Sequence, residues 1–296
     1  MNKGVLSAAG AYILWGFFPI YFHALNNVPP FEVVAHRIVW SFLFVLLVVL
    51  IRREFLSFRS AITPRTLRIY LIAGVLLSVN WMIYIYGINS GFVVEASLGY
   101  FINPLVNVLL GVLLFRERLR PLQWVPVGLA AVGVTYLAIN YGTLPWIALG
   151  LAFTFGMYGL VKKVAPLGSL HGLTLETSTI FLPALAYLSY LGLKGDSSFG
   201  QASWVTTLLL ALTGVITAIP LLFFASGARL VPLTTLGLLQ YISPMMQFIT
   251  GVFLFHEPFT SARLIGFCII WVALLIFSVE GFFEWQKVAN AAGAET

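Results

Sequence analysis

The chain has 296 residues, of which 60% are apolar and only 9% are charged, and its mean hydropathy is +0.98. Soluble domains have roughly a quarter charged residues, so this composition excludes an ordinary water-soluble protein. The net charge of +6 does not indicate a nucleic-acid-binding protein, because the basic residues lie in short loops between apolar segments.

Ten apolar segments follow one another along the chain, each long enough to cross the hydrocarbon layer as a helix. They cover residues 4–22, 32–51, 66–89, 93–115, 121–139, 144–163, 171–193, 203–227, 233–255 and 262–280. Their apolar content is continuous, whereas the strands of a membrane β-barrel alternate apolar and polar residues. We therefore predict an all-α integral membrane protein with ten transmembrane helices.

The lysines and arginines predict the orientation, since basic residues near span ends stay on the cytoplasmic side of a membrane. With the N-terminus inside, only Lys194 and Arg263 lie outside and Arg37 lies within a span, which leaves thirteen of the sixteen basic residues inside. Both termini are therefore predicted to face the cytoplasm.

The sequence resembles itself at a constant offset of 140 residues. The clearest block sets NPLVNVLLGVLLFRE (103–117) against SPMMQFITGVFLFHE (243–257), which aligns Glu117 with Glu257. Each half holds five spans, an odd number, so the second half enters the membrane from the opposite side. We predict two inverted five-helix repeats, residues 1–140 and 141–296, as in many secondary carriers. A duplicated scaffold without transport is the alternative.

Four ionisable side chains within the spans are candidates for gating or proton coupling, because burying such groups in a membrane is costly. They are His36, Arg37, Glu95 and Glu176. Arg37 either anchors its helix at the outer interface or contacts the solute, and it is close enough in depth to pair with Glu95. The repeat offset aligns Glu176 with His36, which puts one titratable group near each mouth. A carboxylate that merely bonds a neighbouring helix is the alternative.

Polar and small residues recur at every fourth position of the fourth span, from Glu95 to Gly111. Helix packing explains such a stripe, and a solute cavity is the second interpretation. The predicted solute contacts are Asn80, Trp81, Tyr84, Tyr100, Asn103, Asn107, Gln240 and Ser243. Pro104 and Pro244 interrupt two spans at equivalent positions of the repeat and are predicted hinges.

The segment NWMIYIYGINSGFVVEASLGYFINPLVNVLLGVLLFRERLRPLQW (80–124) resembles the RarD group of the EamA-type drug/metabolite transporters, and AYILWGFFPIYF and HRIVWSF extend the similarity. The resemblance implies a central cavity lined chiefly by the first, third and fourth helices and their second-half counterparts, with peripheral fifth and tenth helices. It also implies export of drugs or metabolites across a bacterial inner membrane. The group is associated by name with chloramphenicol resistance.

The sequence thus predicts a secondary transporter whose partners are a small-molecule solute, the lipid bilayer and protons, with no nucleic acid. A GxxxxGK[ST] phosphate loop is absent from the sequence, which argues that the chain does not hydrolyse ATP. The energy source is therefore an ion gradient, or there is none, in which case the protein is an uncoupled facilitator. No HExxH or GxSxG motif and only one cysteine, Cys268, argue against an intramembrane enzyme and against a cofactor or metal. The short loops argue against a scaffold protein. The sequence does not decide whether the chain forms a homodimer.

Overall fold

The computed structural model describes residues 3–140, 145–256, 260–262, 264–273, 275–276 and 279–280. Glu257, Arg263 and Lys287, on which parts of the repeat and orientation predictions rest, lie outside the described residues. Every regular element within these ranges is helical. The predicted all-α class is thereby confirmed.

The elements of the first half are α1 (Lys3–Gly16), α2 (Phe18–His23), α3 (Pro30–Ile51), α4 (Phe55–Ser60), α5 (Pro64–Asn89), α6 (Val93–Phe115), η1 (Pro121–Gln123) and α7 (Trp124–Asn140). Those of the second half are α8 (Trp146–Val164), α9 (Ser169–Lys194), α10 (Trp204–Leu230), α11 (Leu233–Leu239), α12 (Ile242–Ile249) and the π-helical turn η2 (Thr250–Leu254). A further apolar helix, Leu264–Ala273, lies within the tenth predicted span.

Eight of the ten predicted spans have helices of sufficient length and apolar content to cross a membrane. The seventh predicted span, α9, has the length but is less apolar, because the run Glu176–Thr179 is entirely polar. The tenth predicted span lies partly outside the described residues. The protein is therefore a multi-pass membrane protein, and the count of ten remains a prediction.

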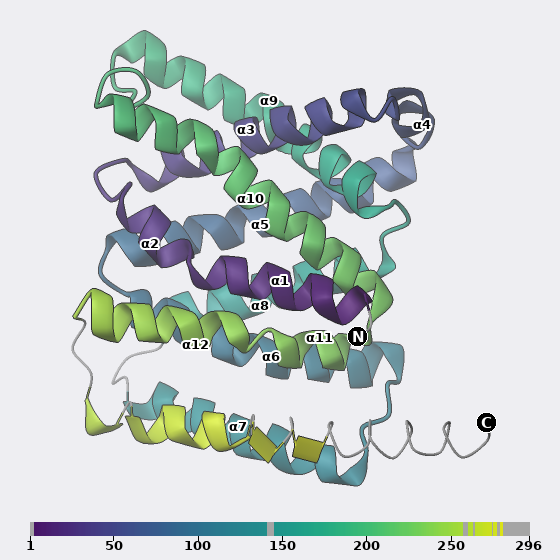
Figure 1. Ribbon diagram of the computed structural model, residues 1–296, viewed down its shortest axis with the longest axis vertical. Helices are drawn as coiled ribbons and strands as arrows, with labels where there is room; N and C mark the ends of the chain where they lie inside the picture. The colour runs from purple at the N-terminus through teal and green to yellow at the C-terminus, as the bar shows by residue number, and fades with distance from the viewer. Residues whose placement is uncertain are drawn as a thin grey trace.

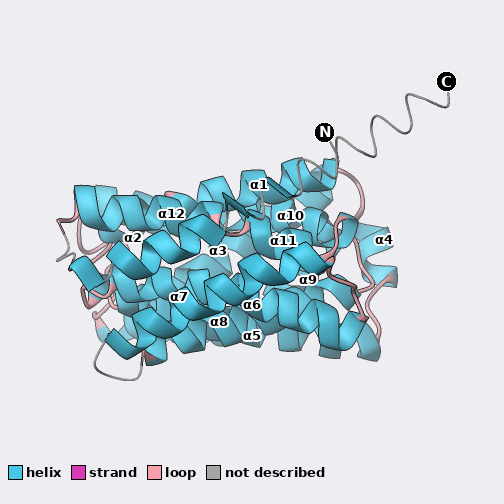
Figure 2. Ribbon diagram, turned by 90° about the horizontal axis from the view of Figure 1, so that it is seen from below, coloured by secondary structure: helices cyan, strands magenta, loops and turns pink. Residues whose placement is uncertain are grey.

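The long helices run side by side across the view of Figure 1, and Figure 2 shows the same alignment from below. The helices α9 and α7 lie at opposite edges of the molecule, with α10, α5, α1 and α8 between them. At the α7 edge, a Cβ atom at Gly133 would lie only 2.9 Å from Ile270, which shows how tightly α7 packs on Leu264–Ala273. The fifth and tenth spans are thus neighbours at the periphery.

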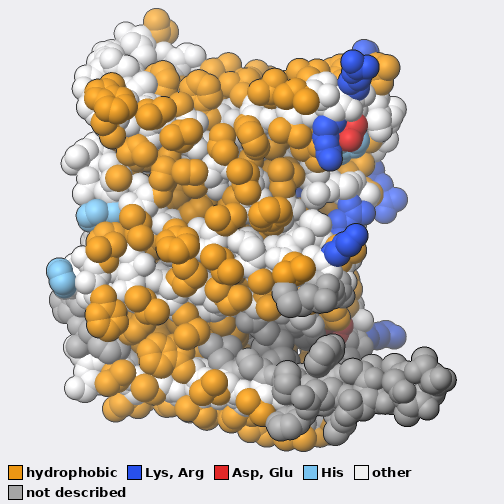
Figure 3. Space-filling model, in the orientation of Figure 1, with side chains coloured by type: hydrophobic (Ala, Val, Ile, Leu, Met, Phe, Trp, Pro, Cys, Tyr) orange, Lys and Arg blue, Asp and Glu red, His pale blue; other side chains and the backbone are white. Residues whose placement is uncertain are grey.

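The surface has the composition that a lipid environment requires. Large apolar side chains such as Leu47, Leu113 and Phe153 are more than half exposed, and hydrophobic side chains cover most of the face in Figure 3. Lysine and arginine gather along one end of the bundle, the end where the N-terminus and α4 lie. An apolar girdle with basic residues at one end matches the orientation pattern of a membrane protein.

Helix ends and breaks follow from local sequence. Pro64 opens α5 at a position where its missing N–H is not needed, and the side chains of Thr63 and Thr66 cap that end reciprocally. The ninth span breaks between α11 and α12, just before Pro244, whose nitrogen cannot donate to the carbonyl of Gln240. Pro104, in contrast, lies inside a continuous α6.

Two close helix crossings are related by the 140-residue offset. In one the glycine belongs to the first half of the chain and its neighbour to the second half, and in the other these roles are exchanged. A Cβ atom at Gly16 would lie 2.5 Å from the Met246 sulfur, and one at Gly156 would lie 2.6 Å from Val106. Each glycine is thus 140 residues from the other, as are the two residues that they meet. Without a Cβ atom, these helices approach more closely than any larger residue would permit.

A second pair of crossings, between α5 and α9 and between α10 and α3, obeys the same exchange. A Cβ atom at Gly74 would lie 3.4 Å from Ile180, whereas one at Gly214 would overlap the backbone of Trp40. The backbone after the fourth and ninth spans also matches, since Arg116 and His256 both have φ of 53°.

Candidate solute-binding cavity

A cavity lies among α1, α2, α3, α5, α6, α8 and the broken ninth span. Six of the eight predicted solute contacts are in its wall, namely Asn80, Trp81, Tyr84, Tyr100, Gln240 and Ser243. The second span also contributes, through Arg37, whereas α10 contributes no lining side chain. The wall therefore differs from the family expectation in both respects.

The cavity wall carries polar atoms that the protein leaves unsatisfied. The hydroxyls of Tyr12 and Tyr84, Nη1 of Arg37 and Oε1 of Gln247 are buried and have no hydrogen-bond partner among the described residues. A buried polar group without a partner costs about 1–3 kcal/mol, so such groups are rare in folded proteins. Their convergence on one cavity suits a site whose ligand supplies the missing partners.

Other polar groups of the wall are held in place by neighbouring helices. The Asn80 amide nitrogen donates to the Leu151 carbonyl at 3.1 Å and to the Thr154 hydroxyl at 2.9 Å, both on α8. The Gln247 amide nitrogen donates to the Trp15 carbonyl at 3.2 Å, so α12 is tied to α1. These bonds fix the amides across interfaces between the two halves.

Two predicted contacts, Asn103 and Asn107, do not line the cavity. The stripe on α6 faces other helices instead: Asn103 lies 3.5 Å from the Leu151 carbonyl, and Asn107 donates to Oε1 of Gln240 at 2.9 Å. A Cβ atom at Gly99 would lie 2.9 Å from Leu151, which shows that α6 and α8 are in close contact there. Helix packing therefore explains this stripe, and Asn107 reaches the cavity only through Gln240.

Arg37 lies in the cavity wall and is not an interfacial anchor. It is seven residues from the start of α3, about 10 Å along the helix axis, and is only 1% exposed. Its Nε donates to the Thr217 hydroxyl of α10 at 3.1 Å. The guanidinium carbon lies 4.1 Å from the ring centre of Trp81 and 4.7 Å from that of Phe22, so aromatic rings cover the cation.

The predicted pairing of Arg37 with Glu95 does not occur, because Glu95 turns toward the start of α8. Its Oε1 accepts a hydrogen bond of 3.2 Å from the backbone nitrogen of Ile147. A carboxylate at this position stabilises the exposed N–H groups and the positive end of the helix dipole. Glu95 thus orients α8, and Arg37 meets no carboxylate among the described residues.

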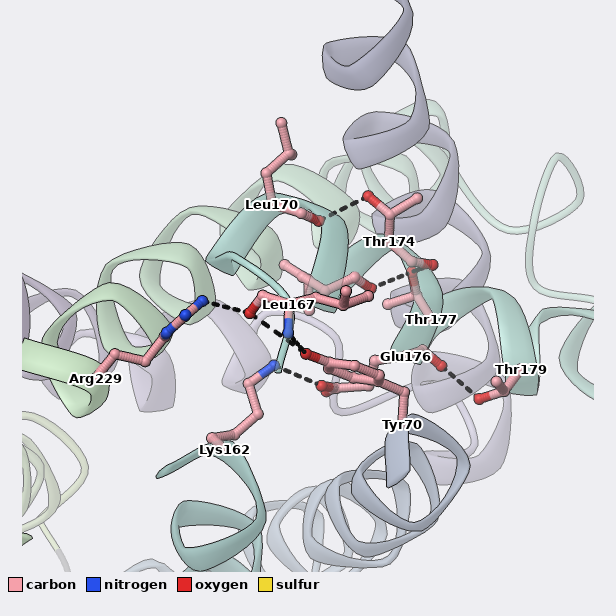
Figure 4. A network of polar contacts seen from close by, with 10 residues as sticks. Tyr70, Lys162, Leu167, Leu170, Thr174, Glu176, Thr177, Thr179 and Arg229 are labelled. Carbon is pink, nitrogen blue, oxygen red and sulfur yellow. Dashed lines mark hydrogen bonds and ion pairs between the residues drawn. The ribbon is translucent and has the colours of Figure 1, made fainter. Parts of the chain in front are cut away.

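Glu176 belongs to a polar network at the end of the bundle that carries the basic residues (Figure 4). Its Oε2 accepts from the ammonium of Lys162 at 2.8 Å, and both side chains are buried. Beside this pair, the Tyr70 hydroxyl accepts from the backbone nitrogen of Leu167 at 3.0 Å, and Arg229 donates to the Leu167 carbonyl. The network joins α5, α8, α9 and α10 and closes this end.

His36 lies six residues into α3, the helix that starts at the end of the bundle away from α4. Its Nδ1 accepts from the indole nitrogen of Trp40 at 3.1 Å, and its ring stacks on Phe199. Glu32, one turn earlier, accepts from the backbone nitrogen of Ser198 at 2.7 Å and lies 3.9 Å from His36. These contacts tie α3 to the loop between α9 and α10.

Sequence reasoning missed several of these residues. Lys162 is not among the four ionisable side chains predicted within the spans, although an acid and a base on either side of the α8–α9 turn are visible in the sequence. Glu32 was treated as a span boundary. Tyr12, Trp15 and Phe155 of the cavity wall are ordinary aromatic residues in apolar segments, and no local pattern distinguishes them from packing residues.

The cavity is narrow in this conformation, and most of the side chains that line it are buried. The centre of a water molecule can occupy about 30 Å³ within it, which is room for about two waters. The cavity therefore has no room for a drug-sized molecule in this conformation.

A bundle of apolar membrane helices around a narrow cavity with unsatisfied polar groups has the architecture of a multi-pass membrane transporter. The chain belongs to the EamA-like transporter family, whose model matches residues 2–139 and again residues 144–279. This membership confirms the resemblance noted in the sequence, and it indicates a transporter rather than an enzyme.

Two sequence relatives match nearly the whole chain. The chain is 49% identical to "Protein RarD" of Streptomyces exfoliatus, covering 94% of this chain and 88% of the relative. It is 45% identical to "Uncharacterized transporter YojE" of Bacillus subtilis, covering 98% of each. A protein of known crystal structure has the same fold, with a TM-score of 0.67 at 19% identity and coverage of 94% and 96%.

Proposed function

We propose that the protein is a secondary transporter that exports a small solute from the bacterial cytoplasm by alternating access. The observation that carries the proposal is the narrow, buried central cavity with its unsatisfied polar groups. A narrow, buried site at the interface of two halves is what a carrier needs in order to open to one side of the membrane at a time.

The exchanged glycine crossings support two inverted repeats, residues 1–140 and 141–296. In such a carrier, the two halves adopt unequal conformations, and exchanging those conformations opens the site to the other side. The contacts of Gly16 with Met246 and of Gly156 with Val106 are equivalent under this exchange. Pro244, next to a helix break, and its repeat partner Pro104 are the proposed hinges.

The basic end of the bundle is the proposed cytoplasmic side, with both termini inside and the bacterial inner membrane as location. The Lys162–Glu176 network then forms the cytoplasmic gate, and the contacts of Glu32 and His36 with the α9–α10 loop lie at the outer gate. Opening toward the cytoplasm requires α8 and α9 to separate from α5 and α10.

Counterflow in proteoliposomes tests transport through the cavity. A thermal-shift panel of amino acids, nucleosides and antibiotics, including chloramphenicol, first selects a solute, because a ligand stabilises the state that it binds. We expect counterflow of that solute by the wild-type chain and none by Ser243→Phe, whose ring fills the cavity. Thr135→Phe, at a lipid-exposed site on α7, is the matched control. Equal counterflow in both variants contradicts the proposed pathway.

Proton coupling is tested separately from the pathway. In inside-out vesicles with an acidic interior, we expect the pH gradient to drive accumulation of the solute above equilibrium. A protonophore should abolish that accumulation without stopping counterflow. His36 and Glu176 are the proposed proton-carrying groups, since a change in their charge alters the contacts that close each end. Accumulation that persists in the presence of the protonophore contradicts proton coupling. Equilibration of the solute without accumulation identifies an uncoupled facilitator.

A further inference from the structure

The charge of the cavity indicates what kind of solute it accepts. Arg37 is the one charged side chain among the described residues that line the cavity. Its surroundings are aromatic rings, which attract a cation but accept no strong hydrogen bond. Its Nη1 has no partner, while its Nε is used by Thr217. The guanidinium therefore keeps donor capacity free inside the protein.

The other buried charges are compensated in a way that Arg37 is not. Lys162 pairs with Glu176 at 2.8 Å, Glu95 accepts from the start of α8, and Glu32 accepts from Ser197 and Ser198. A buried charge without a partner is strongly destabilising. The presence of Arg37 in the cavity wall is explained if the solute itself carries the opposite charge.

Resting on the proposed transport function, we propose that the solute is a small organic anion whose carboxylate binds the Arg37 guanidinium. The planar guanidinium presents parallel N–H donors that match the two oxygens of a carboxylate. The rest of the wall indicates the body of the solute. Trp15, Tyr100 and Phe155 form an aromatic cluster, with the Tyr100–Phe155 and Trp15–Phe155 rings 6.2 and 5.5 Å apart. These rings suit an aromatic or other apolar group.

The polar groups around the cavity complete the assignment. Asn80, Gln240 and Gln247 supply neutral amides, which recognise hydroxyl, amino or carbonyl substituents without adding charge. A cationic solute is excluded on electrostatic grounds, because it would meet Arg37 and no acid among the described lining residues. The site therefore selects an acid over the corresponding neutral amide and over the amine.

A thermal-shift comparison on the purified full-length chain tests this selection. The probes are phenylacetate, phenylacetamide and phenethylamine, which share one ring and differ in the charged group. We expect phenylacetate to bind the wild-type chain at least about tenfold more tightly than the amide, as a charge-assisted hydrogen bond requires. The amine should give no shift. Equal responses to acid and amide, or no response to the acid, overturn the proposal.

Variants at Arg37 assign the preference to this residue. Arg37→Met should abolish the preference for the acid and should not lower the unfolding temperature of the unliganded protein, because it removes an uncompensated buried charge. Arg37→Lys should keep part of the preference. Arg59→Gln, on exposed α4, should keep all of it. An undiminished preference in Arg37→Met overturns the assignment, and the wild-type comparison stands by itself if a variant fails to fold.

Counterflow separates this inference from the transport function on which it rests. Counterflow of a neutral solute, with no preference for acids, leaves secondary transport intact and overturns the anion proposal. Binding of phenylacetate through Arg37 without counterflow of that probe or of any panel solute supports the anion site and contradicts transport. Competition by phenylacetate for a transported solute, lost in Arg37→Met, is the result expected if both hold.

Discussion

Lys162→Met is expected to lower the free energy of unfolding by about 3–5 kcal/mol, because it leaves the carboxylate of Glu176 buried without its cation. The effect is large since both side chains are almost fully buried, and Oε1 of Glu176 has no hydrogen-bond partner among the described residues. Denaturation of the purified protein in detergent measures the loss.

Two further variants show whether the pairing causes the loss. The double substitution Lys162→Met with Glu176→Gln removes both charges and should restore most of the stability. Lys163→Met, at the neighbouring residue whose ammonium donates to the Val231 carbonyl at 2.7 Å and meets no acid among the described residues, should cost about 1 kcal/mol. If the double variant is as unstable as Lys162→Met, the buried pair is not the origin of the effect.

The double variant also tests the coupling role of Glu176. With neither Lys162 nor Glu176 left to exchange a proton, the variant should retain counterflow and lose accumulation driven by a pH gradient. Accumulation at the wild-type level would assign proton movement to another group, with His36 as the next candidate.

Gly214→Ala is expected to destabilise the protein by about 1–3 kcal/mol and to impair transport, since the new methyl group overlaps the backbone of Trp40. The α10 helix must then move away from α3. Arg37 lies one turn before Ser41, whose hydroxyl donates to the Gly214 carbonyl, and Thr217 holds the guanidinium one turn beyond Gly214. The displacement therefore reaches the cavity as well as the packing.

The repeat offers graded controls for this substitution. Gly74→Ala, at the equivalent crossing, meets the Glu176 carbonyl oxygen at 3.1 Å and Ile180 at 3.4 Å, both further away than the Trp40 backbone is from Gly214, and should be tolerated better than Gly214→Ala. Gly192→Ala on α9 meets nothing within 4 Å and should be neutral or stabilising, because alanine is the better helix former. The order is measured by thermal unfolding, and equal losses in all three variants contradict the packing explanation.

The spans could be predicted from the sequence because membrane insertion is a local property. About twenty consecutive apolar residues match the thickness of the hydrocarbon layer whatever the rest of the chain does. The 140-residue repeat was equally visible, since Pro104 and Pro244 and the blocks around them align directly. Six cavity residues were found for the related reason that polar side chains in apolar helices are conspicuous.

The sequence could not predict in the same way which neighbouring helix each helix face contacts. Glu95, Asn103 and Asn107 form one polar stripe, but the stripe turns to α8 and to Gln240, residues that lie about 50 and 130 positions further along the chain. An isolated stripe reports that a helix face is polar, and it carries no information about what lies opposite.

The sequence by itself determined that this is a membrane protein, that its basic residues gather on one side, and that it resembles itself at an offset of 140 residues, because all three depend on composition and order along the chain. Only the tertiary structure decided that Lys162 pairs with Glu176, that Glu95 orients α8, and that Arg37 faces the cavity without an acid. These contacts depend on how helices rotate and cross, and close packing at residues such as Gly16 and Gly214 sets those angles between segments distant in the chain.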